Sequence, residues 1–134
     1  GRWNPAGTEA LYLAHPLDTC RAEFRRMAEG QGLGPDSFLP RHLHTVAVTG
    51  LEIVDLSTPE RLERVGFSPT ELDKQWGPCQ RIGDAIDTLG VGGLLVPSAT
   101  GEGVVLTVFV RRAHRGELNV IRTEVFRIGS DGVG

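Results

Sequence analysis

The chain of 134 residues has the length of one ordinary domain and can bury roughly two-thirds of its unfolded surface. Its 40% hydrophobic and 23% charged residues are normal for a globular protein, and no apolar run approaches the eighteen or so residues of a membrane span. The net charge of −3 gives no general attraction to nucleic acid.

The chain opens with a predicted loop and a short strand. Residues 1–5 (Gly-Arg-Trp-Asn-Pro) are polar and turn-like, unlike the basic and then apolar start of a signal peptide. Residues 10–14 (Ala-Leu-Tyr-Leu-Ala) predict a short buried strand. Because side chains alternate along a strand, Leu11 and Leu13 share one face and Tyr12 points to the other.

The next segment predicts an amphipathic helix over residues 18–28, with Pro16 in the first turn, where its missing N–H costs nothing. Glu23 falls at the edge of the apolar stripe, so its carboxylate either lines a cleft beside the strand or is solvated. Gly30 is predicted to cap the helix in the left-handed conformation, and residues 30–35 to form a connector rather than a phosphate-binding loop. The apolar stripe consists of Leu17, Cys20, Phe24, Met27 and Ala28.

A second strand is predicted over residues 42–49 and a third, shorter one over residues 51–56. His42 and His44 lie on the same face of the second strand and are expected to be neighbours. A His-x-His pair can bind zinc, but it needs at least one more ligand, and no cluster of Cys or His follows nearby. Surface or hydrogen-bonded histidines are therefore favoured, and no metal site is expected.

Three helices follow in the middle of the chain. Residues 57–60 combine a hydroxyl cap, a proline and an acidic residue, and Gly66 is expected to stop this helix. Residues 68–75 show similar helix-start signals, here with a capping box, and predict a second short helix. Residues 78–89 predict the last helix, and Asp87 lies mainly off its apolar stripe. That stripe consists of Cys79, Ile82, Ile86 and Leu89.

The remaining sequence predicts three strands. Residues 94–96 form a near-continuous apolar run, typical of a strand covered on both faces, and the proline that follows ends its pairing. Ser98 then sits just past the strand, where it is either a ligand contact or a turn residue. Residues 104–110 and 118–128 predict the last two strands, joined by the basic turn 111–116. The polar half of the last strand indicates an edge position.

These elements amount to about six short strands and four helices without strict alternation, which is an α+β pattern. We therefore expect a single α+β domain over residues 1–134. Cys20 and Cys79 both lie on apolar helix faces, which favours free thiols in a reducing cytoplasm over a disulfide. The composition thus predicts a cytoplasmic protein.

Several short motifs, taken in order, resemble the RES domain family. Gly1 to Asn4 (Gly-Arg-Trp-Asn) opens the chain, Tyr12 follows the arginine by ten residues, and Glu23 comes eleven residues later. Ile82-Gly83-Asp84 resembles the Gly-Asp helix of the family, and residues 94–99 resemble its strand ending in Pro-Ser. The match is spread over most of the chain and is more specific than any one motif.

The resemblance implies a toxin that degrades NAD by cleaving the bond between nicotinamide and ribose, through hydrolysis or phosphorolysis. An arginine can neutralise phosphate oxygens, a tyrosine can stack on nicotinamide, and a carboxylate can stabilise the positive charge that develops on the ribose. Ser98 is expected to hydrogen-bond the nicotinamide end. The implied catalytic residues are Glu23, Arg2 and Tyr12, and the implied NAD-binding residues are Arg2, Tyr12, Ser98 and the weaker candidate Asn4.

Two alternative functions stay open at this point. The same residues serve an ADP-ribosyltransferase that modifies a protein, and a catalytically inactive binding module keeps the fold without the reaction. The resemblance also implies an ADP-ribosyltransferase-like mixed sheet split around a cleft, with helices outside, and a helical Xre-type antitoxin as partner. NAD is the only cofactor implied, as substrate, and no direct contact with nucleic acid or a membrane is expected.

The chain departs from the family pattern in two places. Members usually have a further strand before the Gly-Arg motif, and this chain is expected to lack it. Residues 100–103 do not show the asparagine found there in many members, so the sequence leaves one wall of the pocket undefined. It also leaves open the choice among the three reactions, any protein target and the oligomeric state.

Overall fold

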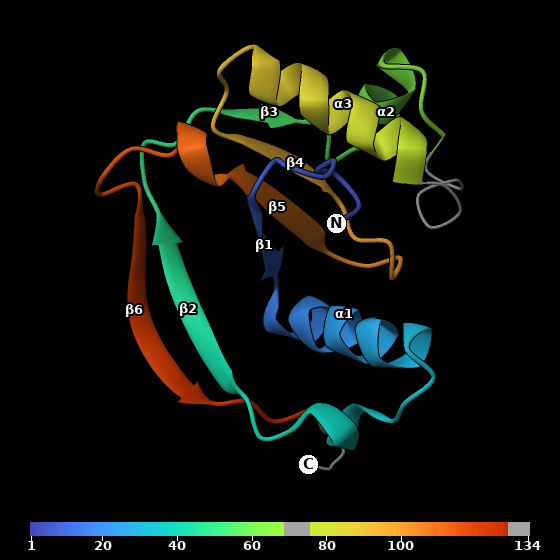
Figure 1. Cartoon of the computed structure of the whole chain (residues 1–134), viewed down its shortest axis with the longest axis vertical. Coiled ribbons are helices and arrows are strands. Elements are labelled where there is room, and N and C mark those ends of the chain that lie inside the picture. The colour runs from blue at the N-terminus through green and yellow to red at the C-terminus, as the bar shows by residue number, and fades with distance from the viewer. Residues whose placement is uncertain (69–75, 129–134) are drawn as a thin grey trace.

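The computed structural model describes residues 1–68 and 76–128. Strands and helices alternate irregularly along this part of the chain (Figure 1). The strands are β1 (Ala10–His15), β2 (His42–Val48), β3 (Ile53–Asp55), β4 (Gly93–Pro97), β5 (Val104–Phe109) and β6 (Leu118–Val125). The α-helices are α1 (Leu17–Gly30), α2 (Pro59–Arg64) and α3 (Trp76–Thr88), and two short 3-10 helices are η1 (Pro35–Phe38) and η3 (Val110–Arg112).

The strands form two separate sheets. Four of them pair in the order β1-β5-β4-β3, with β3 parallel to β4 and the other pairs antiparallel. The remaining two, β2 and β6, pair with each other as an antiparallel ribbon (Figure 1). The mixed α/β architecture therefore agrees with the predicted mixture of short strands and helices.

The main core lies between the four-stranded sheet and the helices α2 and α3 (Figure 1). As the apolar run predicted, β4 is its centre, since Leu94 and Val96 are fully buried. The strand β1, in contrast, was predicted to be buried but lies at the sheet edge, where Leu11 is 40% exposed. The buried core residues are Trp3, Leu56, Leu62, Phe67, Cys79, Ile86, Leu94, Val96, Val105 and Phe109.

The helix α1 packs toward the ribbon side of the molecule. Its Phe24 makes edge-on contacts with Phe126, just after β6, and with Phe38 of η1, at ring-centroid distances of 5.0 and 6.3 Å. Nearly all of β6 is exposed, in line with the predicted edge strand. The pairing of β2 with β6 shifts between Thr45 and Val46, whose partners are Arg122 and Val120, so the extra residue lies in β6.

Some predicted element boundaries are wrong. Gly30 still belongs to α1, and the left-handed residue after the helix is Gly32, with φ of 73°. Val110 begins the 3-10 turn of residues 110–112 instead of ending the strand β5, whose last residue is Phe109. The short helix α2 is capped as predicted, because the Thr58 hydroxyl accepts a hydrogen bond from the Arg61 N–H at 3.2 Å. The predicted helix over residues 68–75 lies outside the described residues apart from its first residue.

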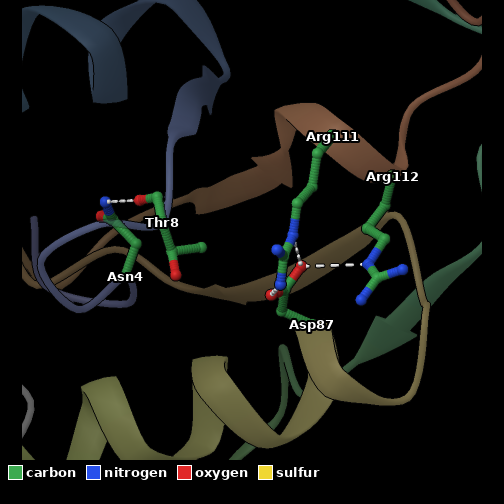
Figure 2. A network of polar contacts seen from close by, with 5 residues as sticks. All are labelled: Asn4, Thr8, Asp87, Arg111 and Arg112. Carbon is green, nitrogen blue, oxygen red and sulfur yellow. Dashed lines mark hydrogen bonds and ion pairs between the residues drawn. The ribbon is translucent and has the colours of Figure 1, made fainter.

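A buried carboxylate joins the end of α3 to η3. Asp87 is only 1% exposed, and its oxygens accept hydrogen bonds from the guanidinium groups of Arg111 and Arg112 (Figure 2). Sequence reasoning placed Asp87 off the apolar stripe and assigned the two arginines to a basic turn. The structure corrects that interpretation, because the turn folds back and neutralises the carboxylate. The hydrogen bond from Arg111 is the main reason that the pKa of Asp87 lies below its ordinary value.

In the part of the chain that the structure describes, no helix combines the length and the apolar character that crossing a membrane requires.

Candidate functional site

The first group of predicted site residues ties the opening loop to β1. The Tyr12 hydroxyl accepts a hydrogen bond from the backbone N–H of Trp3 at 3.0 Å and donates one to Oδ1 of Asn4. The side-chain amide of Asn4 donates in turn to the carbonyl of Thr8 at 2.7 Å. Burial raises the pKa of the Tyr12 phenol, so the hydroxyl is neutral near pH 7 and acts as this donor.

Arg2 is held beside the start of α3. Its guanidinium carbon lies 5.6 Å from the ring centroid of Trp76, which is the geometry of a cation–π contact. The next residue, Trp3, is 2% exposed, and its backbone lies directly on Gly83 of α3. A Cβ atom at position 83 would lie 1.7 Å from the Trp3 carbonyl oxygen, so only glycine allows this approach. The Gly-Asp motif thus has a packing role beneath the opening loop.

The second group joins α1 to the end of β4. The hydroxyl of Ser98 donates a hydrogen bond of 2.6 Å to Oε2 of Glu23, although the two residues are 75 positions apart. Ser98 is 3% exposed and Glu23 is half-buried, so the bond lies at the border between core and solvent. The Ser98 oxygen also contacts Thr100, whose N–H is 3.1 Å away and whose hydroxyl is 2.7 Å away.

The four-stranded sheet relates Tyr12 of the first group to Ser98 of the second. Tyr12 pairs with Thr107, which pairs with Leu94, and Ser98 follows Leu94 by four residues. With strands about 4.8 Å apart and a rise of about 3.3 Å per residue, the Cα atoms of Tyr12 and Ser98 are roughly 16 Å apart. The structure therefore forms two separate hydrogen-bonded pairs of candidate residues. Tyr12 is bonded to Asn4, and Ser98 is bonded to Glu23.

A surface depression of about 220 Å³ lies between α1 and the turn after β4. Its lining includes Thr100, which contacts Ser98, and Ala22, which precedes Glu23. The full lining is Asp18, Thr19, Ala22, Thr100, Gly101 and Glu102. A second depression, of about 320 Å³, lies between α1 and the ribbon, and its lining includes no residue that contacts Ser98. The first one is thus the hollow that adjoins the Glu23–Ser98 pair.

The turn after β4 is fixed against α1 by a residue that sequence reasoning missed. Thr19 is 3% exposed and donates a hydrogen bond of 3.2 Å to the carbonyl of Glu102. Gly103 has φ of 78°, and a Cβ atom there would lie 1.9 Å from the Thr19 hydroxyl. Thr19 looked like an ordinary polar residue of a helix start, and only the long-range contact reveals its role.

The histidine pair is a neighbouring pair, as predicted. The rings of His42 and His44 have centroids 6.5 Å apart, and Nδ1 of His44 lies 2.9 Å from the Thr123 hydroxyl. Within residues 1–68 and 76–128, no group of three or more His, Cys, Asp or Glu side chains is arranged to hold a metal ion. Cys20 and Cys79 form no disulfide, and burial raises the pKa of each thiol.

Comparison with known proteins gives concordant matches. The RES domain model matches residues 1–128. The protein named NAD(+) phosphorylase MbcT is 36% identical over 124 residues, which are 90% of this chain and 67% of the relative, both in Mycobacterium tuberculosis H37Rv and in Mycobacterium bovis. The crystal structure of the M. tuberculosis MbcT–MbcA toxin–antitoxin complex matches with a TM-score of 0.83 and 34% identity, over 94% of this chain and 71% of the matched chain. The chain therefore belongs to the RES domain family.

Proposed function

We propose that this chain cleaves the nicotinamide–ribose bond of NAD and acts as the toxin of a toxin–antitoxin pair. The support from comparison is its similarity, over nine-tenths of its length, to proteins named NAD(+) phosphorylase. A phosphorylase uses inorganic phosphate as the acceptor. Phosphorolysis is therefore our first choice of reaction, and hydrolysis is the second.

The observation that carries the proposal is the hydrogen bond between Glu23 and Ser98. It fixes a carboxylate at the surface, beside a hollow, by means of a buried hydroxyl that is remote in sequence. A carboxylate held by a neutral donor keeps its negative charge available for a ligand. This is the requirement for a group that stabilises a cationic transition state.

The proposed reaction is a displacement at the anomeric carbon of the ribose that carries nicotinamide. The C–N bond breaks, its electron pair goes to the pyridinium nitrogen, and nicotinamide leaves as a neutral molecule. A phosphate oxygen or a water oxygen forms the new bond, and water loses a proton to solvent in the second case. Glu23 accepts a hydrogen bond from the ribose 2′-hydroxyl and stabilises the positive charge that builds on the sugar.

The opening loop supplies the binding contacts. Arg2 is the candidate partner of the pyrophosphate, because a guanidinium can bind two phosphate oxygens at once. Tyr12 is 38% exposed although its hydroxyl is engaged, so its ring is the candidate surface for nicotinamide. Asn4 already uses its amide oxygen and nitrogen on Tyr12 and Thr8, which supports a role in holding the loop.

Ser98 takes a role different from the one expected from the sequence. Its single hydroxyl proton is donated to Glu23, so we assign Ser98 to orienting the carboxylate instead of binding the nicotinamide end. The hydrogen bond links the position of the acid to the rigid, buried strand β4. Glu23 is then the group that contacts the ribose, and Ser98 acts through it.

The partner and the detailed fold belong to the same proposal. A complex of toxin and antitoxin is named for the structurally similar MbcT, which supports an antitoxin as the partner of this chain. We propose that the antitoxin is of the helical Xre type and covers the NAD site. We also propose that the two sheets correspond to the split sheet of the ADP-ribosyltransferase fold.

The test is incubation of the purified protein with NAD, with and without inorganic phosphate. We expect free nicotinamide in equal amount to ADP-ribose phosphate when phosphate is present, and slow formation of ADP-ribose without it. A parallel reaction with labelled NAD and a cell lysate checks for transfer to protein. Labelled protein without free ADP-ribose or its phosphate would favour the transferase, and the absence of nicotinamide in every reaction would refute the proposal.

A further inference from the structure

The hydrogen bonds around Ser98 determine which group is the donor and which is the acceptor in each bond. A serine hydroxyl has one proton and two lone pairs. Its proton is donated to Glu23 at 2.6 Å, so Ser98 must accept from both of its other neighbours. These are the N–H of Thr100 at 3.1 Å and the Thr100 hydroxyl at 2.7 Å, and the latter is therefore the donor.

Thr100 has one alternative acceptor, which is weaker. Its hydroxyl lies 3.4 Å from the carbonyl oxygen of Glu102, against 2.7 Å from Ser98. The shorter contact has the better geometry for a hydrogen bond between hydroxyl groups. The chain of donors thus runs from Thr100 through Ser98 to Glu23. A hydroxyl that accepts a hydrogen bond is also a stronger donor, because successive bonds polarise one another.

The turn that carries Thr100 is fixed in place. The backbone N–H of Ser98 donates to the carbonyl oxygen of Gly103 at 3.0 Å, and the N–H of Gly101 donates to the carbonyl oxygen of Ser98 at 3.1 Å. Thr19 of α1 then binds the carbonyl of Glu102. Since Glu23 lies on the same helix, one turn further along, the turn and the carboxylate are attached to the same rigid element.

We infer that Thr100 is a positioning residue of the NAD-cleaving site: its hydroxyl holds the Ser98 proton on Glu23 and so fixes the carboxylate that faces the ribose. This inference rests on the proposed function. Thr100 also lines the 220 Å³ hollow, which places its hydroxyl at the edge of the site.

The experiment compares steady-state nicotinamide release by the wild type, T100V, T100S and S98A, together with the double variant S98A/T100V. Valine keeps the shape and the backbone N–H of threonine but removes the hydroxyl. We expect T100V to lower kcat about three- to tenfold with KM changed less than about twofold, because a neutral hydrogen bond to a positioned group is lost. T100S should keep kcat within about twofold of the wild type, since it restores the donor.

Two controls separate this role from a general effect on the fold. T49V removes a hydroxyl from an exposed threonine far from the turn and should leave kcat unchanged. If Thr100 acts through Ser98, the double variant should be no slower than S98A alone, a non-additive result. The inference would be overturned if T100V had the wild-type kcat, or if T100V and T100S lost kcat equally. It would also be overturned if the kcat losses of S98A and T100V were fully additive in the double variant. A wild type that releases no nicotinamide would instead overturn the proposed function, and this inference with it.

Discussion

Two carboxylates on two helices differ in burial and in the charge of their hydrogen-bond donors. Asp87 at the end of α3 is 1% exposed and receives hydrogen bonds from two guanidinium groups. Glu23 on α1 is half-buried and receives its hydrogen bond from the neutral hydroxyl of Ser98. The first carboxylate is neutralised inside the protein. The second is bound by a neutral donor beside a surface hollow.

The difference separates a structural acid from the acid that we propose to be reactive. A buried carboxylate with two cationic partners has its oxygens committed, and it holds α3 to η3 near the start of β1 (Figure 2). A carboxylate oriented by a hydroxyl is fixed in space without losing its charge to a cation. Only the latter can stabilise a positive charge that develops on a bound ribose. We therefore expect changes near Glu23 to alter turnover and changes near Asp87 to alter stability.

Apart from replacement of Glu23 itself, the largest effect is expected for S98A, which removes the donor to Glu23. A hydrogen bond to a charged group contributes about 1.5 to 3 kcal/mol, so kcat for nicotinamide release should fall roughly 10- to 100-fold. S98T keeps a hydroxyl and serves as the control in the same assay. An S98A variant with the wild-type rate would show that Ser98 does not orient the acid.

A smaller effect, on stability alone, is expected for D87N. The amide keeps the shape of the side chain but loses the charge that pairs with Arg111 and Arg112. Because solvent screens the outer side of the arginines, the free energy of unfolding should fall by only about 1 to 2 kcal/mol. Urea denaturation measures this change. A D87N protein with full stability but a large loss of kcat would contradict the structural role of Asp87.

The smallest effect is the pH dependence of stability. The arginine hydrogen bonds lower the pKa of Asp87 in the folded protein, so this stabilisation is complete above the ordinary pKa of aspartate, about 3.9. It is lost as pH falls through the lowered value. The pKa of Asp55 is lowered by hydrogen bonds from Ser57, which adds an acid-sensitive contribution of the same sign that solvent screening reduces. Urea midpoints from pH 7 down to pH 3 should fall more steeply in the wild type than in D87N, and parallel curves would contradict this.

The sequence predicted the elements that carry the candidate site residues well. The spacing of Arg2, Tyr12 and Glu23 and the serine after a buried strand were visible as motifs, and β1, α1 and β4 form close to their expected positions. These features depend on short-range periodicity and turn chemistry, which a single sequence displays. The RES family assignment rested on them and is confirmed.

The remaining features depend on contacts between distant residues. Asp87 read as a polar residue off the helix stripe, and nothing in its neighbourhood indicated that Arg111 and Arg112 fold back onto it. The same holds for Thr19, whose partner is 83 residues away. Gly83 stood in a recognised motif, yet its role under Trp3 follows only from the close packing of the opening loop.

The most direct test of the account compares E23Q with D87N in one experiment, with NAD cleavage and urea stability measured on both proteins. We predict that E23Q lowers kcat for nicotinamide release at least about 100-fold while the free energy of unfolding stays within about 0.5 kcal/mol of the wild type. D87N should show the opposite pattern, with lower stability and a nearly unchanged kcat. An E23Q protein that still releases nicotinamide at the wild-type rate would contradict the central claim that Glu23 is the reactive acid.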